Sequence, residues 1–168
     1  VQTFEKIINK NLLYIDKTKS IYAITRFGGY YFYARPRRFG KSLMLSTIKS
    51  LYEGRKELFK GLWIDDKWDW SKFNPVIHLS FSSINYQNKT LEAAISHELS
   101  IIASKKEIIL ASEFAKDKFK ELITALAEKN GKVVLLIDEY DKPIIDYLGN
   151  NIKLAETNRN ILKTLYSV

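Results

Sequence analysis

The stretch "YYFYARPRRFGKSLMLSTIKSLYEG", residues 30–54, contains an aromatic run, a basic loop and a regular apolar pattern, in that order. The run Tyr30–Ala34 is bounded by glycines and a proline, which predicts a β-strand. Ser42–Tyr52 places small or apolar residues at steps of three to four, which predicts an α-helix. The tripeptide Gly-Lys-Ser at 40–42 stands between the two, so this stretch predicts a strand–turn–helix junction.

Such a junction suits a bound anion. The first backbone N–H groups of a helix have no acceptor within the helix and lie at its positive end. Lys41 adds a mobile cation for the β- and γ-phosphates of a nucleotide, and the hydroxyl of Ser42 is a suitable ligand for Mg²⁺. Position 35, where a phosphate-binding loop ordinarily opens with glycine, holds Arg35, and Pro36 favours extended geometry there. The tripeptide alone is therefore weak support for a nucleotide site.

The rest of the chain predicts an α/β architecture. Further strands are expected at Pro75–Phe81 and Val133–Ile137, and the second is apolar throughout, which predicts burial on both faces of a sheet. Helices are expected at 17–27, around 91–102, from about 112 to 130 and at 158–166. Strands separated by helices favour a largely parallel sheet. Because no linker or low-complexity segment interrupts the chain, we predict one domain over residues 1–168.

Two carboxylates follow the third predicted strand. In "VVLLIDEYDKP", Asp138 and Glu139 stand at its carboxyl end, where open α/β sheets bind ligands. An acidic residue there can hold Mg²⁺ through water, since this ion prefers one or two carboxylates together with phosphate oxygens. A second carboxylate beside it can polarise the attacking water. The order of the two motifs along the chain therefore favours a nucleotide-hydrolysing site.

Three blocks, "YIDKT" (14–18), "RPRRFGKS" (35–42) and "IDEYDKP" (137–143), resemble the signature motifs of the predicted AAA-ATPase-like family of bacterial P-loop proteins. The resemblance runs over nearly the whole chain, and in that family arginine commonly replaces the opening glycine. It implies a P-loop NTPase-type, largely parallel sheet flanked by helices. We expect this chain to be the N-terminal part of such a domain, ending before the fourth strand.

The resemblance also implies roles for individual residues. Lys41 corresponds to the phosphate lysine, Ser42 and Asp138 to the Mg²⁺ ligands, and Glu139 to the catalytic base. The residues implied to contact the ATP cofactor are Arg37, Arg38, Phe39, Gly40, Lys41, Ser42 and Leu43. The resemblance further implies that Tyr14, Asp16 and Thr18 line the adenine side, but nothing in their spacing shows this role, and a surface turn explains these three residues better.

Composition limits the partners. The net charge of +8 favours phosphates, nucleic acid or anionic lipid. Because the chain has no cysteine, disulfides and thiolate zinc sites are excluded, and a cytoplasmic setting is the default. The longest apolar run is too short for a membrane span. The resemblance implies a further C-terminal region, in some members nuclease-like, and the sequence leaves open whether copies form a homo-oligomer.

Two functions are compatible with these features. The first is an ATP-binding module that hydrolyses ATP slowly with Mg²⁺, as a regulatory or motor-like part of a longer protein. The alternative is a nucleic-acid-binding module that uses the basic and aromatic segment 30–38. We expect Tyr30–Ala34 to be buried, which favours the first. A nuclease site within this chain is disfavoured, because Asp141 directly precedes Lys142 where carboxylate-x-Lys spacing is required.

Other aromatic and histidine residues are expected to be structural. Trp63, Trp68 and Trp70 lie in a long connection that we predict to pack against the sheet rather than to form a stacking platform. His78 and His97 have no partner ligands nearby in the sequence. They therefore do not indicate a metal site.

Overall fold

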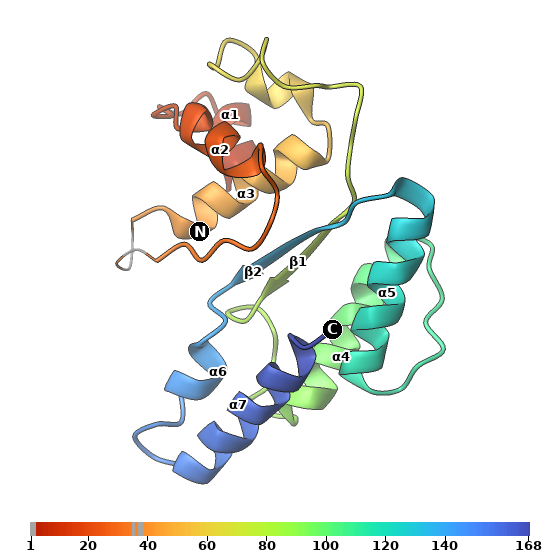
Figure 1. Cartoon of the computed structure of the whole chain (residues 1–168). Helices are drawn as coiled ribbons and strands as arrows, with labels where there is room; N and C mark the ends of the chain where they lie inside the picture. Colours follow the sequence, from red (N-terminus) through yellow and green to blue (C-terminus); the bar gives the residue numbers. More distant parts are fainter. Residues whose placement is uncertain (1–2, 35, 37–38) are drawn as a thin grey trace. The chain divides into compact units, whose positions relative to one another are not determined.

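The computed structural model describes residues 3–34, 36 and 39–168. Its chain divides into two compact units, Val1–Val76 and Ile77–Val168 (Figure 1). The protein is mixed α/β, with a small parallel two-stranded sheet flanked by helices. Within the described part of the chain, no helix combines the length and apolar character that crossing a bilayer requires.

The first unit is helical in its described residues. It contains α1 (Phe4–Asn9), α2 (Thr18–Thr25), α3 (Lys41–Tyr52) and the 3₁₀ helix η1 (Lys56–Phe59). Phe4 is fully buried, and its ring centroid lies 4.8 Å from that of Phe59 and 5.0 Å from that of Tyr14. The short helix α1, which the sequence analysis missed, begins where the Thr3 side chain accepts a hydrogen bond from the Lys6 N–H.

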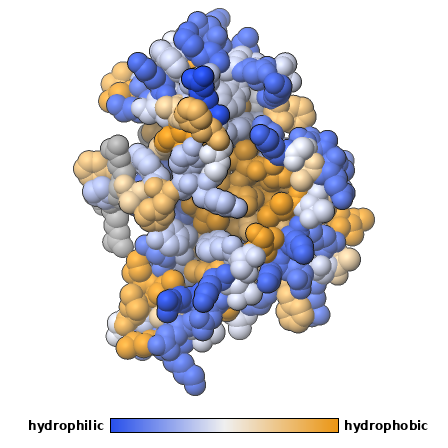
Figure 2. Space-filling model, in the orientation of Figure 1, coloured by the Kyte–Doolittle hydropathy of each residue, from blue (hydrophilic) through white to orange (hydrophobic). Residues whose placement is uncertain are grey.

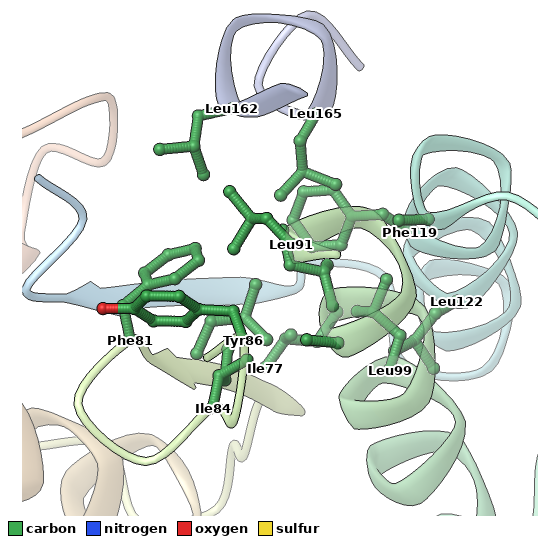
Figure 3. Packing of buried hydrophobic residues seen from close by; sticks show 14 of the residues in the cluster. Ile77, Phe81, Ile84, Tyr86, Leu91, Leu99, Phe119, Leu122, Leu162 and Leu165 are labelled. Atoms are coloured by element: carbon green, nitrogen blue, oxygen red, sulfur yellow. The ribbon is translucent and has the colours of Figure 1, made fainter. Parts of the chain in front are cut away.

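The second unit holds the sheet and its helices. In chain order they are β1 (Val76–Ser80, beginning at the unit boundary), α4 (Leu91–Ser104), α5 (Ala115–Asn130), β2 (Val134–Asp138), α6 (Lys142–Ile145) and α7 (Ile152–Leu165). One cluster of buried side chains joins β1, α4, α5 and α7. Figure 3 shows Leu162 and Leu165 of α7 directed towards Leu91 of α4 and Phe119 of α5. Ile137 of β2 and Ile144 of α6 pack against the same cluster.

The predicted strand Tyr30–Ala34 is wrong. None of these residues belongs to a strand, and their side chains are exposed: Tyr30 is fully accessible and Phe32 is 75% exposed. An extended aromatic segment becomes a strand only when a neighbouring backbone pairs with it. Among the described residues the strands β1 and β2 pair with each other and with no third strand. The expectation that this segment is buried is therefore wrong as well.

The third predicted strand is present as β2, but the prediction that it is buried on both faces is wrong. Leu136 is 7% exposed, whereas its neighbour Leu135 is 41% exposed. Complete burial requires neighbouring strands on both edges and packed layers on both faces. Within the described residues β2 pairs with β1 alone. Elsewhere on the protein, in the view of Figure 2, other hydrophobic residues also lie at the surface between hydrophilic ones.

The predicted helices are present, and their ends differ from the prediction for local reasons. The last helix begins at Ile152 instead of Asn158, because the Asn151 side chain accepts a hydrogen bond from the Leu154 N–H and starts it earlier. The helix expected from about Ser112 begins at Ala115, whose N–H donates to the Glu92 carboxylate at 2.6 Å. The short helix α6 was not predicted.

Candidate functional site

The Gly-Lys-Ser tripeptide opens α3, as predicted. Gly40 has a φ of 76°, in the left-handed region that glycine adopts without strain, and the helix begins at the next residue. The first bond of the helix runs from the Met44 N–H to the Gly40 carbonyl at 2.9 Å. The Ser42 N–H precedes that bond, in the first turn, where the helix supplies no acceptor. The positive end of α3 can therefore receive an anion.

Arg37 and Arg38, predicted to contact the nucleotide, lie outside the described residues, as does Arg35. Phe39, predicted to contact it as well, is described and is 63% exposed. Lys41, Ser42 and Leu43, the first residues of α3, are partly exposed.

Polar side chains fix the beginning of α3. The Thr47 hydroxyl donates to the Leu43 carbonyl at 2.9 Å, and the Thr47 side chain is completely buried. Ser46 donates to the same carbonyl at 2.8 Å and accepts a bond of 2.9 Å from the Phe4 N–H. α1 and α3 are thus joined close to the Gly40 turn. Of the predicted contact residues, Leu43 therefore serves this packing through its carbonyl oxygen.

The "YIDKT" block forms a closed local network. Asp16 accepts hydrogen bonds from the Thr18 N–H at 2.7 Å, from the Thr18 hydroxyl at 2.6 Å and from the Trp63 N–H at 2.7 Å. Burial would raise the pKa of Asp16, but these hydrogen bonds outweigh it and hold the pKa below the ordinary value. Burial raises the pKa of Tyr14, partly offset by its hydrogen bond with Thr47. The carboxylate of Asp16 and the hydroxyl of Thr18 are thus hydrogen-bonded within the first unit.

The three tryptophans pack against aromatic rings of the first unit. The ring centroid of Trp63 lies 5.6 Å from that of Tyr22 in α2. The corresponding distance is 5.3 Å from Trp68 to Tyr52 of α3. It is also 5.3 Å from Trp70 to Phe59 of η1. Their partners all belong to the first unit. The connection that carries them therefore completes the helical core of that unit.

The two acidic residues stand at the end of β2. Asp138 is the last residue of the strand, and its carbonyl accepts a hydrogen bond from the Phe81 N–H at 3.1 Å. Its side chain is 7% exposed. A buried carboxylate costs free energy unless a partner compensates its charge. Such a carboxylate suits a bound cation.

Glu139 has an unusual backbone. Its φ is 52°, in the left-handed region, and its side chain is exposed. For a residue other than glycine this conformation costs about 1–3 kcal/mol and persists only where surrounding contacts impose it. Glu139, whose backbone is strained, is also the residue that the resemblance implies to be the catalytic base.

The predicted residues fall into two groups. Lys41 and Ser42 belong to the first unit, and Asp138 and Glu139 belong to the second. Among the described residues no three His, Cys, Asp or Glu side chains gather around one point. Mg²⁺ does not require such a cluster, since it usually binds one or two protein oxygens together with phosphates and water. Asp138 and Ser42 each carry a side-chain oxygen of the kind that Mg²⁺ binds.

Sequence reasoning missed a polar cluster directly after Glu139. The Lys142 ammonium and the Tyr86 hydroxyl each donate to one oxygen of Asp146 at 2.6 Å. The Asn158 amide donates to the Pro143 carbonyl at 2.8 Å. Only the spacing of four between Lys142 and Asp146 could have revealed part of this cluster, as a helical ion pair.

Two open surface grooves lie elsewhere in the second unit. One, of about 380 Å³, follows α5 between Ser112 and Glu128, and the other, of about 410 Å³, lies between α4 and Phe114. Neither is lined by Asp138 or Glu139. We therefore do not assign the nucleotide to either groove.

Comparison with known proteins identifies relatives of this chain. The sequence model described as "Predicted AAA-ATPase" matches residues 1–168. A protein of Azotobacter chroococcum mcd 1, described as "Uncharacterized protein in vnfD 5'region", is 40% identical over 171 residues. That alignment covers 100% of this chain and 33% of the relative, so the chain spans about a third of the relative's length. No solved structure matches.

Proposed function

The chain belongs to the predicted AAA-ATPase family, and on that premise we propose that it binds ATP with Mg²⁺ and hydrolyses it slowly. The family supports a role in nucleotide binding. One structural observation carries the proposal for this chain. Gly40 adopts a left-handed conformation directly before α3, so the helix begins at the lysine and serine that the motif requires.

The proposed roles follow from chemistry. The N–H groups at the beginning of α3 and the Lys41 ammonium bind the β- and γ-phosphates. Ser42 and Asp138 are the proposed Mg²⁺ ligands, and the ion would neutralise charge on the phosphates. Glu139 is exposed and acts on the attacking water as a base. We further propose that the activity serves a longer protein, in a regulatory or motor-like role, with a region beyond these residues as its partner.

Equilibrium binding of ATP, with and without Mg²⁺, tests the first part. We expect Lys41→Ala to weaken ATP binding by about tenfold or more, since a charged hydrogen bond contributes about 1.5–3 kcal/mol. Lys49→Ala is a matched control, because Lys49 lies in the same helix and pairs with Glu53 on the surface. Equal losses in the two variants would contradict a specific role for Lys41.

Phosphate release under saturating ATP tests the second part. We expect Glu139→Gln to retain ATP binding and to lose turnover, because the amide keeps the size of the side chain but cannot take a proton from water. A parallel loss of binding would contradict the assignment of Glu139 to the water.

A second candidate function gains support from the exposed aromatic segment 30–33. We propose, as the alternative, that these rings stack on bases of single-stranded nucleic acid. Tyr30 is fully accessible and Phe32 is 75% exposed, and both immediately precede the arginine-rich loop. Base stacking on an aromatic side chain contributes about 1–3 kcal/mol per base.

Fluorescence anisotropy with a labelled single-stranded oligonucleotide tests this alternative. We expect the double substitution Tyr30→Ala and Phe32→Ala to weaken binding by about tenfold or more if the rings stack on bases. Phe114→Ala is the control, since Phe114 is 63% exposed and lies in the second unit. Equal affinity of the double variant and the control would exclude stacking by this segment.

A further inference from the structure

The strained turn at Glu139 needs contacts that impose it. After Glu139 the chain closes a tight turn, in which the Lys142 N–H donates to the Glu139 carbonyl at 3.0 Å. α6 then begins at Lys142 and contains Pro143 in its first turn. The short helix is only four residues long, so it is too short to be stable without tertiary contacts.

One of those contacts comes from the loop after β1. The hydroxyl of Tyr86 donates to Asp146, at the end of α6, across 60 positions of sequence. The Tyr86 side chain is 5% exposed and belongs to the hydrophobic cluster. Figure 3 shows its ring among the clustered side chains, with the oxygen at the outer end of the ring. Tyr86 therefore links the core to the polar segment.

The same Asp146 oxygen also accepts a bond from Lys142 at the start of α6, so Asp146 joins both ends of the short helix to Tyr86. The Lys142 ammonium and the Tyr86 hydroxyl hold the pKa of Asp146 below its ordinary value. Burial and the Asp146 carboxylate raise the pKa of Tyr86, so the hydroxyl keeps its proton for this bond. Asp146 therefore stays charged and the Tyr86 hydroxyl stays protonated over the neutral range.

A second contact comes from α7. Asn158 is 2% exposed, and its amide donates to the Pro143 carbonyl at 2.8 Å. This carbonyl lies in the first turn of α6. A buried amide that loses such a partner costs about 1–3 kcal/mol. Asn158 therefore fixes the backbone just after the Glu139 turn from a helix that belongs to the core.

We propose that Tyr86 and Asn158 are positioning residues that hold the turn carrying Glu139, and thereby set the placement of its carboxylate for hydrolysis. The consequence for activity rests on the function proposed above, whereas the consequence for the turn does not. Neither residue would contact the nucleotide. Their loss therefore lowers kcat and leaves nucleotide affinity unchanged, because a catalytic group displaced by about 1 Å can lose about 100-fold in rate.

The test compares Tyr86→Phe with the unsubstituted protein, using the full chain. This substitution removes one hydroxyl and keeps the ring in the core. We expect kcat to fall by about tenfold or more, ATP affinity to stay the same, and hydrogen exchange of the Lys142 amide to become faster. Tyr52→Phe is the matched control, since it removes a hydroxyl bonded to Thr25 in the first unit. It should leave exchange at Lys142 unchanged.

A second variant guards against loss of folding. Asn158→Leu keeps the approximate size of the side chain, buries no charge and removes the donor amide, so it should reproduce the loss of kcat and the faster exchange at Lys142. Unchanged exchange at Lys142 in both variants would overturn the proposal, and so would faster exchange with unchanged kcat. If the unsubstituted protein has no turnover, the proposed hydrolysis fails. Exchange alone then decides whether Tyr86 and Asn158 hold the turn.

Discussion

The carboxylate of Asp16 accepts a hydrogen bond of 2.7 Å from the backbone N–H of Trp63, 47 positions further along the chain. Its other oxygen accepts the N–H and the hydroxyl of Thr18, the first residue of α2. One side chain therefore joins the beginning of α2 to the tryptophan-containing connection. The Trp63 ring in turn contacts Tyr22 of the same helix.

We expect Asp16→Ala to lower the free energy of unfolding by about 1 kcal/mol, the usual cost of losing a side chain that accepts N–H groups at the start of a helix. Urea unfolding at neutral pH measures this difference. Lys17→Ala is a suitable control, because Lys17 is adjacent and its side chain forms no cap for α2. A cost for Lys17→Ala equal to that for Asp16→Ala would show that the hydrogen bonds of Asp16 do not stabilise the fold.

The contribution of Asp16 should also depend on pH. Because its pKa is lower in the folded protein than in the unfolded chain, its contribution is complete above the unfolded value of about 3.9 and is lost as pH falls through the folded value. The difference in stability between the unsubstituted protein and Asp16→Ala should therefore be constant from about pH 7 to about pH 5 and shrink below about pH 4. A difference that grows on acidification would contradict the lowered pKa.

The backbone at Gly40 supports a further prediction. A Cβ added at Gly40 would meet no atom within 4 Å, so the cost of Gly40→Ala comes from its φ of 76° alone. That cost is about 1–2 kcal/mol. We expect Gly40→Ala to disturb the beginning of α3 and to weaken ATP binding. Gly149→Ala is the control, since Gly149 has open space around it and no left-handed φ. Equal ATP affinity of the two variants would argue against a role for this turn in binding.

The sequence predicted those elements that local residues determine. α3 follows from its own periodicity and from Gly40, and β2 follows from a continuous apolar run bounded by polar residues. The segment 30–34 has an equally strong local pattern, yet it forms no strand, because pairing depends on a neighbour elsewhere in the chain. Local patterns therefore identify extended segments without establishing that they are paired.

The same limit applies to the candidate site. Lys41 and Glu139 could be proposed as site residues because motifs place specific residue types at fixed positions in the sequence. The bond between Tyr86 and Asp146 spans 60 positions and depends on how the loop after β1 packs, so no spacing rule predicts it. The positive φ of Glu139 was also unpredictable, since glutamate has no preference for that conformation.

The unequal burial of two neighbouring leucines in β2 leads to the last prediction. Leu136 is 7% exposed and Leu135 is 41% exposed, although both have the same side chain and lie in the same strand. Truncation of a buried leucine to alanine costs about 2–5 kcal/mol, because apolar contacts are lost and a cavity remains. We expect Leu136→Ala to lower the free energy of unfolding by an amount within that range. Leu135→Ala should lower it by less than about 1 kcal/mol. Urea unfolding of the two variants, compared at equal m-values, measures both costs. Equal losses would mean that Leu135 is buried to the same extent in solution, as the continuous apolar run of the sequence first suggested.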